Sequence, residues 1–161
     1  MPPAGLDLAT WQAQFEDLRL WWGTAGYERC FQTDPRWSGR RVRICFGAVD
    51  YFCNVWINGA FAGRHEGGYL PFDVDVTEFL HSAEDNSVVV EVRDPGREES
   101  TGSAAPFRFE EIPHGKQSWY GPVGGLWQSV FLEATAHSFI RSARVRADIS
   151  GRVRVDVRLD P

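Results

Sequence analysis

Short runs of alternating apolar and polar residues dominate the sequence from Tyr27 onward. In residues 41–49 the apolar side chains share one face of an extended chain, opposite Arg43, and residues 152–159 alternate in the same way. A period of two is typical of a strand with one buried and one solvated face. Further strands are predicted at 52–57, 88–93, 127–133 and 142–148.

The dipeptide Asn58-Gly59 separates two of these apolar runs. Because a type I′ turn needs positive φ at both central positions, Asn-Gly here predicts a β-hairpin. Helix-like spacing of apolar residues occurs only at 8–22, where no clear cap closes the segment, so a short helical or irregular lead-in is predicted there. The pattern as a whole predicts an all-β fold, an antiparallel β-sandwich or jelly roll.

Two segments depart from this rhythm. Residues 94–118 have little strand character, and a loop of that length in a compact domain is usually functional or disordered. Residues 138–161 supply two strands after an apparent stop at Glu133-Ala134. We therefore predict a first domain at 1–137 and a two-strand extension at 138–161, which either packs on the sandwich edge or begins a further domain.

Composition narrows the classes of partner. The chain has 161 residues, with 17 basic and 22 acidic side chains and a net charge of −5, which suits one ordinary domain. The arginines are scattered, so a nucleic-acid partner is not expected. No apolar run approaches the roughly 20 residues of a membrane-spanning helix, so no membrane partner is expected. Aromatic residues make up 14% of the chain, enough for some to be displayed on the surface.

The cysteines and the N-terminus leave the compartment open. Cys30, Cys45 and Cys53 lie in apolar or alternating runs without metal-type spacing, which predicts buried, reduced thiols. A bridge between Cys30 and Cys45 on neighbouring strands is the alternative if the protein is secreted. The residues after Met1 show no basic region followed by an apolar stretch, so the protein is either cytoplasmic or secreted with a leader absent from this sequence.

Two runs carry a family resemblance. They are VDYFCNVWINGAFAGRHEGGYLPFDVDVTEFL at 49–80 and GKQSWYGPVGGLWQSVFLE at 115–133. With the strand between them they resemble the N-terminal sugar-binding domain of family 2 glycoside hydrolases, the β-galactosidase and β-glucuronidase group. Within the first run, Asn58 is interpreted as a turn residue. Asp50 and His65 are interpreted as buried side chains whose hydrogen bonds are satisfied.

The resemblance implies a noncatalytic jelly-roll domain of the galactose-binding-domain kind. In the family, an immunoglobulin-like domain follows the sandwich, and the two catalytic carboxyl groups belong to a TIM barrel further downstream. Residues 138–161 resemble the start of that immunoglobulin-like domain. In some members an acidic residue shortly before the Gly-Leu-Trp-Gln stretch reaches the sugar. Trp119 and Tyr120 occupy that neighbourhood here, so that contact is not carried over.

Sugar binding needs an aromatic face for the C–H face of a pyranose and planar polar groups for its hydroxyls. The candidate substrate-binding residues are His114, Lys116, Gln117, Trp119, Tyr120 and Asp94. Trp119 and Tyr120 could instead cover the sandwich edge or contact another domain. Core or interface packing is predicted for the other tryptophans, at positions 21, 22, 37, 56 and 127.

The leading functional hypothesis is a noncatalytic carbohydrate-binding module that supports the active site of a family 2 type enzyme acting on β-galactosides, β-glucuronides or related β-glycosides. One alternative is an autonomous lectin-like protein. The other is a minimal hydrolase using loop carboxylates such as Glu110 and Glu111, which more often form a solvated charge cluster. No cofactor or metal is predicted, because the acidic run at 84–86 has no diagnostic spacing for calcium. Homo-oligomerisation stays open.

Overall fold

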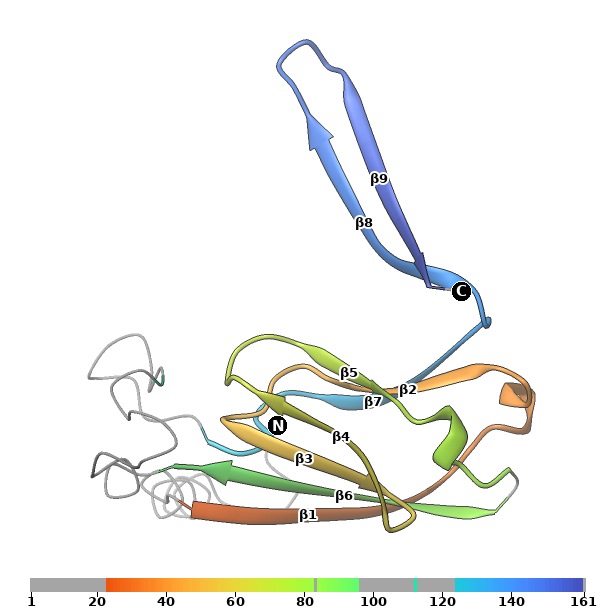
Figure 1. Cartoon of the computed structure of the whole chain (residues 1–161), viewed down its shortest axis with the longest axis vertical. Helices are drawn as coiled ribbons and strands as arrows, with labels where there is room; N and C mark the ends of the chain where they lie inside the picture. Colours follow the sequence, from red (N-terminus) through yellow and green to blue (C-terminus); the bar gives the residue numbers. More distant parts are fainter. Residues whose placement is uncertain (1–22, 83, 96–111, 113–123, 161) are drawn as a thin grey trace, which may run out of the picture.

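A computed structural model describes residues 23–82, 84–95, 112 and 124–160 of the chain (Figure 1). The strands in these residues are β1 (Gly23–Gln32), β2 (Arg41–Phe46), β3 (Phe52–Ile57), β4 (Ala60–Glu66), β5 (Phe72–Asp75), β6 (Asp85–Asp94), β7 (Val130–Thr135), β8 (Phe139–Ala147) and β9 (Val153–Asp160). Two short 3-10 turns, η1 (Pro35–Trp37) and η2 (Thr77–Phe79), complete the described elements. Neither turn has the length and apolar character that a membrane crossing needs. The lead-in predicted at 8–22 lies outside the described residues.

The strands form an antiparallel β-sandwich, as the alternation predicted. One sheet has the order β1-β6-β3-β4 and the other the order β5-β2-β7, and the two sheets lie face to face (Figure 1). Strands β8 and β9 pair only with each other among the described elements. The sandwich therefore contains seven of the described strands, and the last two form a separate hairpin.

The core lies between the inner faces of β2 and β3. Each of these strands alternates between half-buried and buried positions along its whole length. The buried side chains are Val42, Ile44, Phe46, Cys53, Val55 and Ile57, joined by Val90 and Val92 of β6. Burying one such aliphatic or aromatic side chain contributes about 1.5–3 kcal/mol. This core therefore supplies the main driving force that holds the two sheets together.

Close approach of the sheets at their β4–β5 edge depends on a glycine. A Cβ added to Gly63 would lie 2.9 Å from Cγ1 of Val74, closer than packed carbon atoms can approach. Next to this contact, Phe72 stacks on Phe46 with 4.7 Å between ring centroids, and His65 stacks on Phe72 at 3.8 Å. Gly63 thus lets β4 pass close to β5.

The predicted Asn58-Gly59 turn is confirmed. Asn58 has φ of 51° and Gly59 has φ of 79°, so both central residues adopt the positive φ of a type I′ turn. The Asn58 amide donates to the Phe79 carbonyl and to Oδ1 of Asn86, each at 2.8 Å, and its Oδ1 accepts from the Ser87 backbone at 2.8 Å. Asn58 therefore ties the β3–β4 hairpin to η2 and to the start of β6.

Three details of the sequence prediction are wrong. The strand predicted from residue 127 begins at Val130, so Trp127 lies before β7. Cys30 is exposed on β1, and only Cys53 is buried. Cys30 and Cys45 belong to different sheets and all three thiols are free, so the alternative bridge does not form. Sheet membership depends on pairing between distant segments, and local alternation does not specify it.

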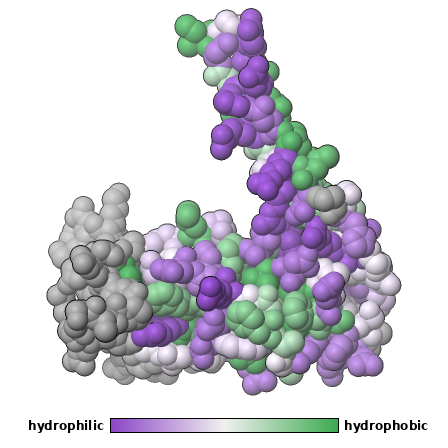
Figure 2. All heavy atoms as spheres, viewed as in Figure 1, coloured by the Kyte–Doolittle hydropathy of each residue, from purple (hydrophilic) through white to green (hydrophobic). Residues whose placement is uncertain are grey.

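The β8–β9 hairpin exposes an apolar face, which we call the hairpin face. Its cross-strand pairs are Ile140 with Leu159, Ala143 with Val157, Val145 with Val155, and Ala147 with Val153. Val145 and Leu159 are 64% and 65% exposed, respectively. Figure 2 shows hydrophobic residues along one side of the hairpin and hydrophilic ones along the other. An isolated two-stranded hairpin is marginal in water, and nothing among the described residues covers this face.

Ion pairs join the base of the hairpin to the outer face of the β5-β2-β7 sheet. Arg43 pairs with Asp73 and Glu133, and Asp73 also accepts from Nη1 of Arg141 at 2.8 Å. The Arg43 guanidinium lies 4.4 Å from the ring centroid of Phe139, close enough for a cation–π contact. The hairpin is therefore attached at its base by side chains as well as by the backbone.

The Asn58 network yields a prediction about stability. Asn58→Ala removes three hydrogen bonds, leaves buried Asn86 short of a partner and places alanine at positive φ. We expect a loss of about 2–4 kcal/mol in the free energy of unfolding, measured by urea denaturation. Asn54→Ala, which removes one hydrogen bond to Glu91, is the control, with an expected loss below about 1 kcal/mol. Equal losses in the two variants would contradict this role for Asn58.

Candidate functional site

Three connections and the end of one strand meet at one end of the sandwich. The connections are residues 47–51 between β2 and β3, 67–71 between β4 and β5, and 124–129 before β7. Strand β6 ends at Asp94 beside them. The segment that joins β6 to β7 therefore begins and ends here, and it contains most of the predicted substrate-binding residues.

Backbone hydrogen bonds join the three connections. The Asp50 N–H donates to the Gly125 carbonyl at 3.0 Å, and the Gly125 N–H donates back to the Asp50 carbonyl at 3.0 Å. Gly67 donates to the Tyr51 carbonyl, also at 3.0 Å. Gly125 and Gly67 have φ of 74° and 122°, conformations that favour glycine. The glycines in these connections thus permit the turns that bring the segments together.

An aromatic surface lies on these connections, and we define it as Tyr69, Leu70 and Trp127. The rings of Tyr69 and Trp127 meet edge to face with 5.9 Å between centroids. Nε1 of Trp127 donates to the Gly68 carbonyl at 2.8 Å, which fixes the indole. The side chains remain accessible, with Trp127 37%, Tyr69 41% and Leu70 73% exposed. Exposed, positioned rings of this kind can stack on the apolar face of a sugar.

Two carboxyl groups lie buried against glycines of these connections. Asp50 is 4% exposed and Asp94 is 5% exposed. A Cβ at Gly68 would lie 2.3 Å from Oδ1 of Asp50, and a Cβ at Gly124 would lie 2.4 Å from Oδ2 of Asp94. Each carboxyl group therefore occupies the space that a glycine leaves open. We refer to Asp50 and Asp94 as the carboxyl pair.

Burial, and next to it the charge of Asp94, raises the pKa of Asp50 to about 7. Oδ1 of Asp50 is buried and has no hydrogen-bond partner among the described atoms. Nε2 of His65 is also buried without a described partner, and burial lowers the pKa of that imidazole. Asn58 matches the predicted role of turn residue. The prediction that the Asp50 and His65 side chains have all their hydrogen bonds satisfied is wrong at Oδ1 of Asp50 and at Nε2 of His65.

Most of the predicted site residues lie outside the described part of the chain. These are Glu110, Glu111, His114, Lys116, Gln117, Trp119 and Tyr120. Asp94 is described, and it is buried at the end of β6. The sequence reasoning missed Tyr69 and Leu70, and it placed Trp127 inside a strand. A usable signal was present, because a glycine pair stands one or two residues before each ring, in Gly67-Gly68-Tyr69 and Gly124-Gly125-Leu126-Trp127.

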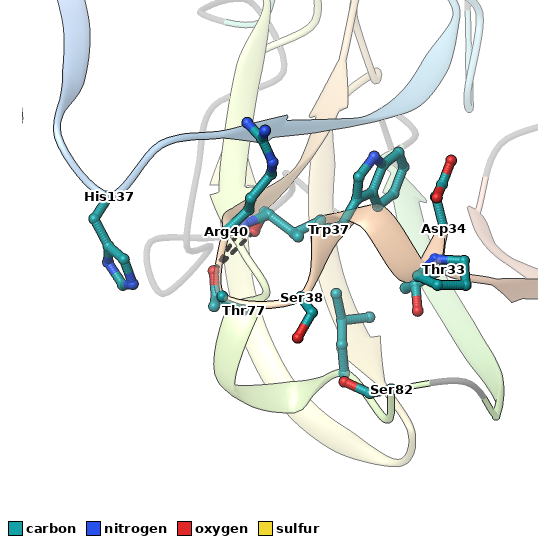
Figure 3. Close-up of a pocket in the computed structure, with 12 residues that line it drawn as sticks. Thr33, Asp34, Trp37, Ser38, Arg40, Thr77, Ser82 and His137 are labelled. Atoms are coloured by element: carbon teal, nitrogen blue, oxygen red, sulfur yellow. Dashed lines mark hydrogen bonds between the residues drawn. The ribbon is translucent and has the colours of Figure 1, made fainter.

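A cavity of about 370 Å³ lies at the opposite end of the sandwich, near η1 and η2. Figure 3 shows Trp37, Ser38 and Ser82 at this cavity, with His137 to one side on the β7–β8 connection. Trp37 also packs against the core, as predicted. One polar group at this cavity already has a hydrogen-bond partner in the protein, because Thr77 Oγ1 accepts from the Val42 N–H at 2.9 Å. The exposed rings therefore make the aromatic surface the stronger candidate site.

Comparison with known proteins gives a family match. Residues 12–102 match the model of "Glycosyl hydrolases family 2, sugar binding domain". A β-glucuronidase of Paenibacillus borealis is 29% identical over 136 residues, which cover 80% of this chain and 23% of that protein. A β-galactosidase of Thermoanaerobacter pseudethanolicus is 31% identical over 127 residues, or 78% of this chain and 15% of that protein. The chain thus spans less than a quarter of the length of these relatives.

Solved structures share the fold. A β-glucuronidase structure from Ruminococcus gnavus superposes with a TM-score of 0.70 and 22% identity, covering 88% of this chain and 24% of that chain. A β-galactosidase structure from Bacteroides fragilis superposes with a TM-score of 0.69 and 22% identity, covering 87% of this chain and 21% of that one. Both superpositions support the sandwich architecture described above.

The close contact between Gly68 and the Asp50 carboxyl group yields a prediction. Gly68→Ala would force its new methyl group against Oδ1 of Asp50, so we expect a loss of about 2–4 kcal/mol in the free energy of unfolding. Gly26→Ala is the matched control, because a Cβ there meets nothing within 4 Å. Adding Asp50→Gly to Gly68→Ala should restore part of the loss. If Gly68→Ala and Gly26→Ala unfold at the same urea concentration, the contact with Gly68 does not constrain Asp50.

Proposed function

Because this chain belongs to the sugar-binding domain family of the family 2 glycosyl hydrolases, we propose that it is a noncatalytic carbohydrate-binding module. In this proposal it supports the active site of an enzyme that hydrolyses β-galactosides, β-glucuronides or related β-glycosides. The observation that carries the proposal is the aromatic surface, which lies where the β6–β7 segment begins and ends. The names of the relatives, β-glucuronidase and β-galactosidase, indicate the class of sugar to test first.

The proposed contact is made by ring faces and completed by polar groups. The indole N–H of Trp127 is already bonded to Gly68, so Trp127 would contact a sugar through its ring. In this proposal the hydroxyl groups of the sugar meet the polar residues predicted from the sequence between β6 and β7. These are His114, Lys116 and Gln117, with Trp119 and Tyr120 as further ring contacts.

A noncatalytic role fits the placement of the carboxyl pair. A retaining glycosidase needs two carboxyl groups about 5 Å apart on either side of the scissile bond, where both reach the substrate. Asp50 and Asp94 are buried beneath Gly68 and Gly124. They are therefore poor candidates for attack on an anomeric carbon or for protonation of a leaving oxygen. The alternative catalytic pair is Glu110 and Glu111.

Residues 138–161 are proposed to begin an immunoglobulin-like domain that follows a first domain at 1–137. The exposed hairpin face supports this, since its apolar pairs would be covered by further strands of such a domain. The remaining proposed partners are a β-glycoside and a downstream TIM barrel that carries the catalytic carboxyl groups. The ion pairs at the hairpin base would then orient the following domain against the sandwich.

Hydrogen exchange tests the hairpin proposal. In the chain of 161 residues, we expect the β8 and β9 amides to exchange much faster than those of β3, because the hairpin buries little apolar surface. When the natural downstream residues are present, the hairpin amides should slow by about 100-fold or more. The β3 amides, which lie in the core, serve as the internal control. Unchanged exchange of the hairpin in the longer protein would contradict the proposed domain.

Ring truncation tests the sugar contact. We expect Trp127→Ala to weaken binding of p-nitrophenyl β-D-galactoside or β-D-glucuronide by about 1–3 kcal/mol in calorimetric titrations. Trp119→Ala should weaken it by a similar amount, about 1–3 kcal/mol, if that ring stacks on the sugar. Phe131→Ala is the control, because Phe131 is 55% exposed on β7 and lies outside the aromatic surface. Equal affinities for all variants would contradict the proposed contact.

The same titrations separate the alternative functions. Turnover of the nitrophenyl glycoside by this chain, abolished by Glu110→Gln or Glu111→Gln, would overturn the noncatalytic role. Tight binding by the isolated chain, unaffected when the natural downstream residues are added, would favour an autonomous lectin-like protein. The module hypothesis predicts no turnover by the isolated chain, and tighter binding when the natural downstream residues are present.

A further inference from the structure

The carboxyl pair is a buried acidic site next to the aromatic surface. Both side chains are at least 95% buried, and Oδ1 of Asp50 has no described partner. The main-chain contact between Tyr51 N–H and the Arg93 carbonyl, at 3.4 Å, brings the residues before β3 alongside the end of β6. An ionised Asp50 carboxylate in such a low-dielectric site costs free energy, and the charge of Asp94 adds to that cost. A proton on the Asp50 carboxyl group removes most of it.

Contacts link the carboxyl pair to Trp127 through the backbone. The Asp50 side chain packs against Gly68, whose carbonyl accepts the indole N–H of Trp127. The Asp50 backbone is paired in both directions with Gly125, two residues before Trp127. Any movement that the carboxyl pair forces on these glycines is therefore passed to the indole. Tyr69 moves with it, because its ring rests against Trp127.

Several other titratable groups lie on the described elements around the pair. His65 and Glu66 lie at the end of β4, and burial lowers the pKa of the His65 imidazole. Burial raises the pKa of Tyr51, and the Tyr27 hydroxyl group lies against Gly125. Arg93, the neighbour of Asp94 on β6, points to the opposite face of that strand.

We propose that Asp50 is a positioning residue that holds the aromatic surface in place while its carboxyl group carries a proton, and that it releases the surface when this proton is lost to solvent. With the proton present, the neutral carboxyl group stays packed against Gly68, and Gly68 stays in reach of the Trp127 indole. Without it, the buried negative charge favours movement of the side chain toward solvent, which displaces the connections that carry Gly68 and Gly125. The inference rests on the proposed function only for what the surface binds.

The direction of the pH effect follows from the burial of Asp50. Its pKa is raised from 3.8 to about 7, so the folded state holds the proton more tightly than the unfolded chain does. The stabilisation is fully present below about pH 4, and it is lost as the pH rises through about 7. Ordering of Trp127 should follow the same course, so the surface is held at acidic pH and loosened at alkaline pH.

The indole resonance of Trp127 tests the coupling without any sugar. In ¹H–¹⁵N spectra recorded from about pH 5 to pH 9, we expect this resonance to shift or broaden with a midpoint near neutrality. Asp50→Asn, which keeps the shape and removes the titration, should abolish the midpoint. Asp94→Asn should move it to lower pH, because the neighbouring charge is gone. Asp156→Asn, an exposed substitution on the hairpin, should leave it unchanged.

Ligand titration completes the test. Affinity of the wild-type chain for p-nitrophenyl β-D-galactoside or β-D-glucuronide, whichever binds, should fall about tenfold or more from pH 5 to pH 9, and that of Asp50→Asn should not. A pH-independent Trp127 resonance, or a midpoint that persists in Asp50→Asn, would overturn the inference. A clear midpoint without any sugar binding would support the positioning role and count against the proposed function.

Discussion

The apolar faces of β2 and β3 pack against each other, and the rest of the sandwich depends on that contact. Each strand places every second side chain in the core, so the two sheets are held face to face by Val42, Ile44 and Phe46 on one side and Val55 and Ile57 on the other. The edge strands add to this pair by backbone pairing with β3, β2 or β6. With the strands fixed in this way, the connections between them can carry special conformations at one end.

Those connections are where the chain departs from regular structure, and the aromatic surface lies there. Glycines at 67, 68, 124 and 125 allow tight turns and close contacts that side chains would block. The space they leave is occupied by Asp50 and Asp94, two groups that are costly to bury. Stability contributed by the core thus offsets the cost of burying these polar groups at the end that carries Tyr69 and Trp127.

Much of the fold could be predicted from local pattern, whereas most of the candidate site could not. Alternation identified the strands around Ile44, Val55 and Val157, because the face on which a side chain lies is a local property of an extended chain. The same reasoning misplaced Trp127, since exposure depends on where the pairing of β7 begins. It also gave Asp50 a satisfied partner, although the surroundings of Asp50 depend on Gly68 and Gly125, which come from distant parts of the chain.

The sequence by itself determined the strands, the Asn58-Gly59 hairpin, the family and the class of ligand to test, because each of these is encoded in short runs of residues. Only the tertiary structure decided that Asp50 and Asp94 are both buried and that the ring of Tyr69 meets the ring of Trp127. The physical reason is sheet pairing. The antiparallel registers of β3 with β6 and of β2 with β7 bring residues together that lie far apart in the chain.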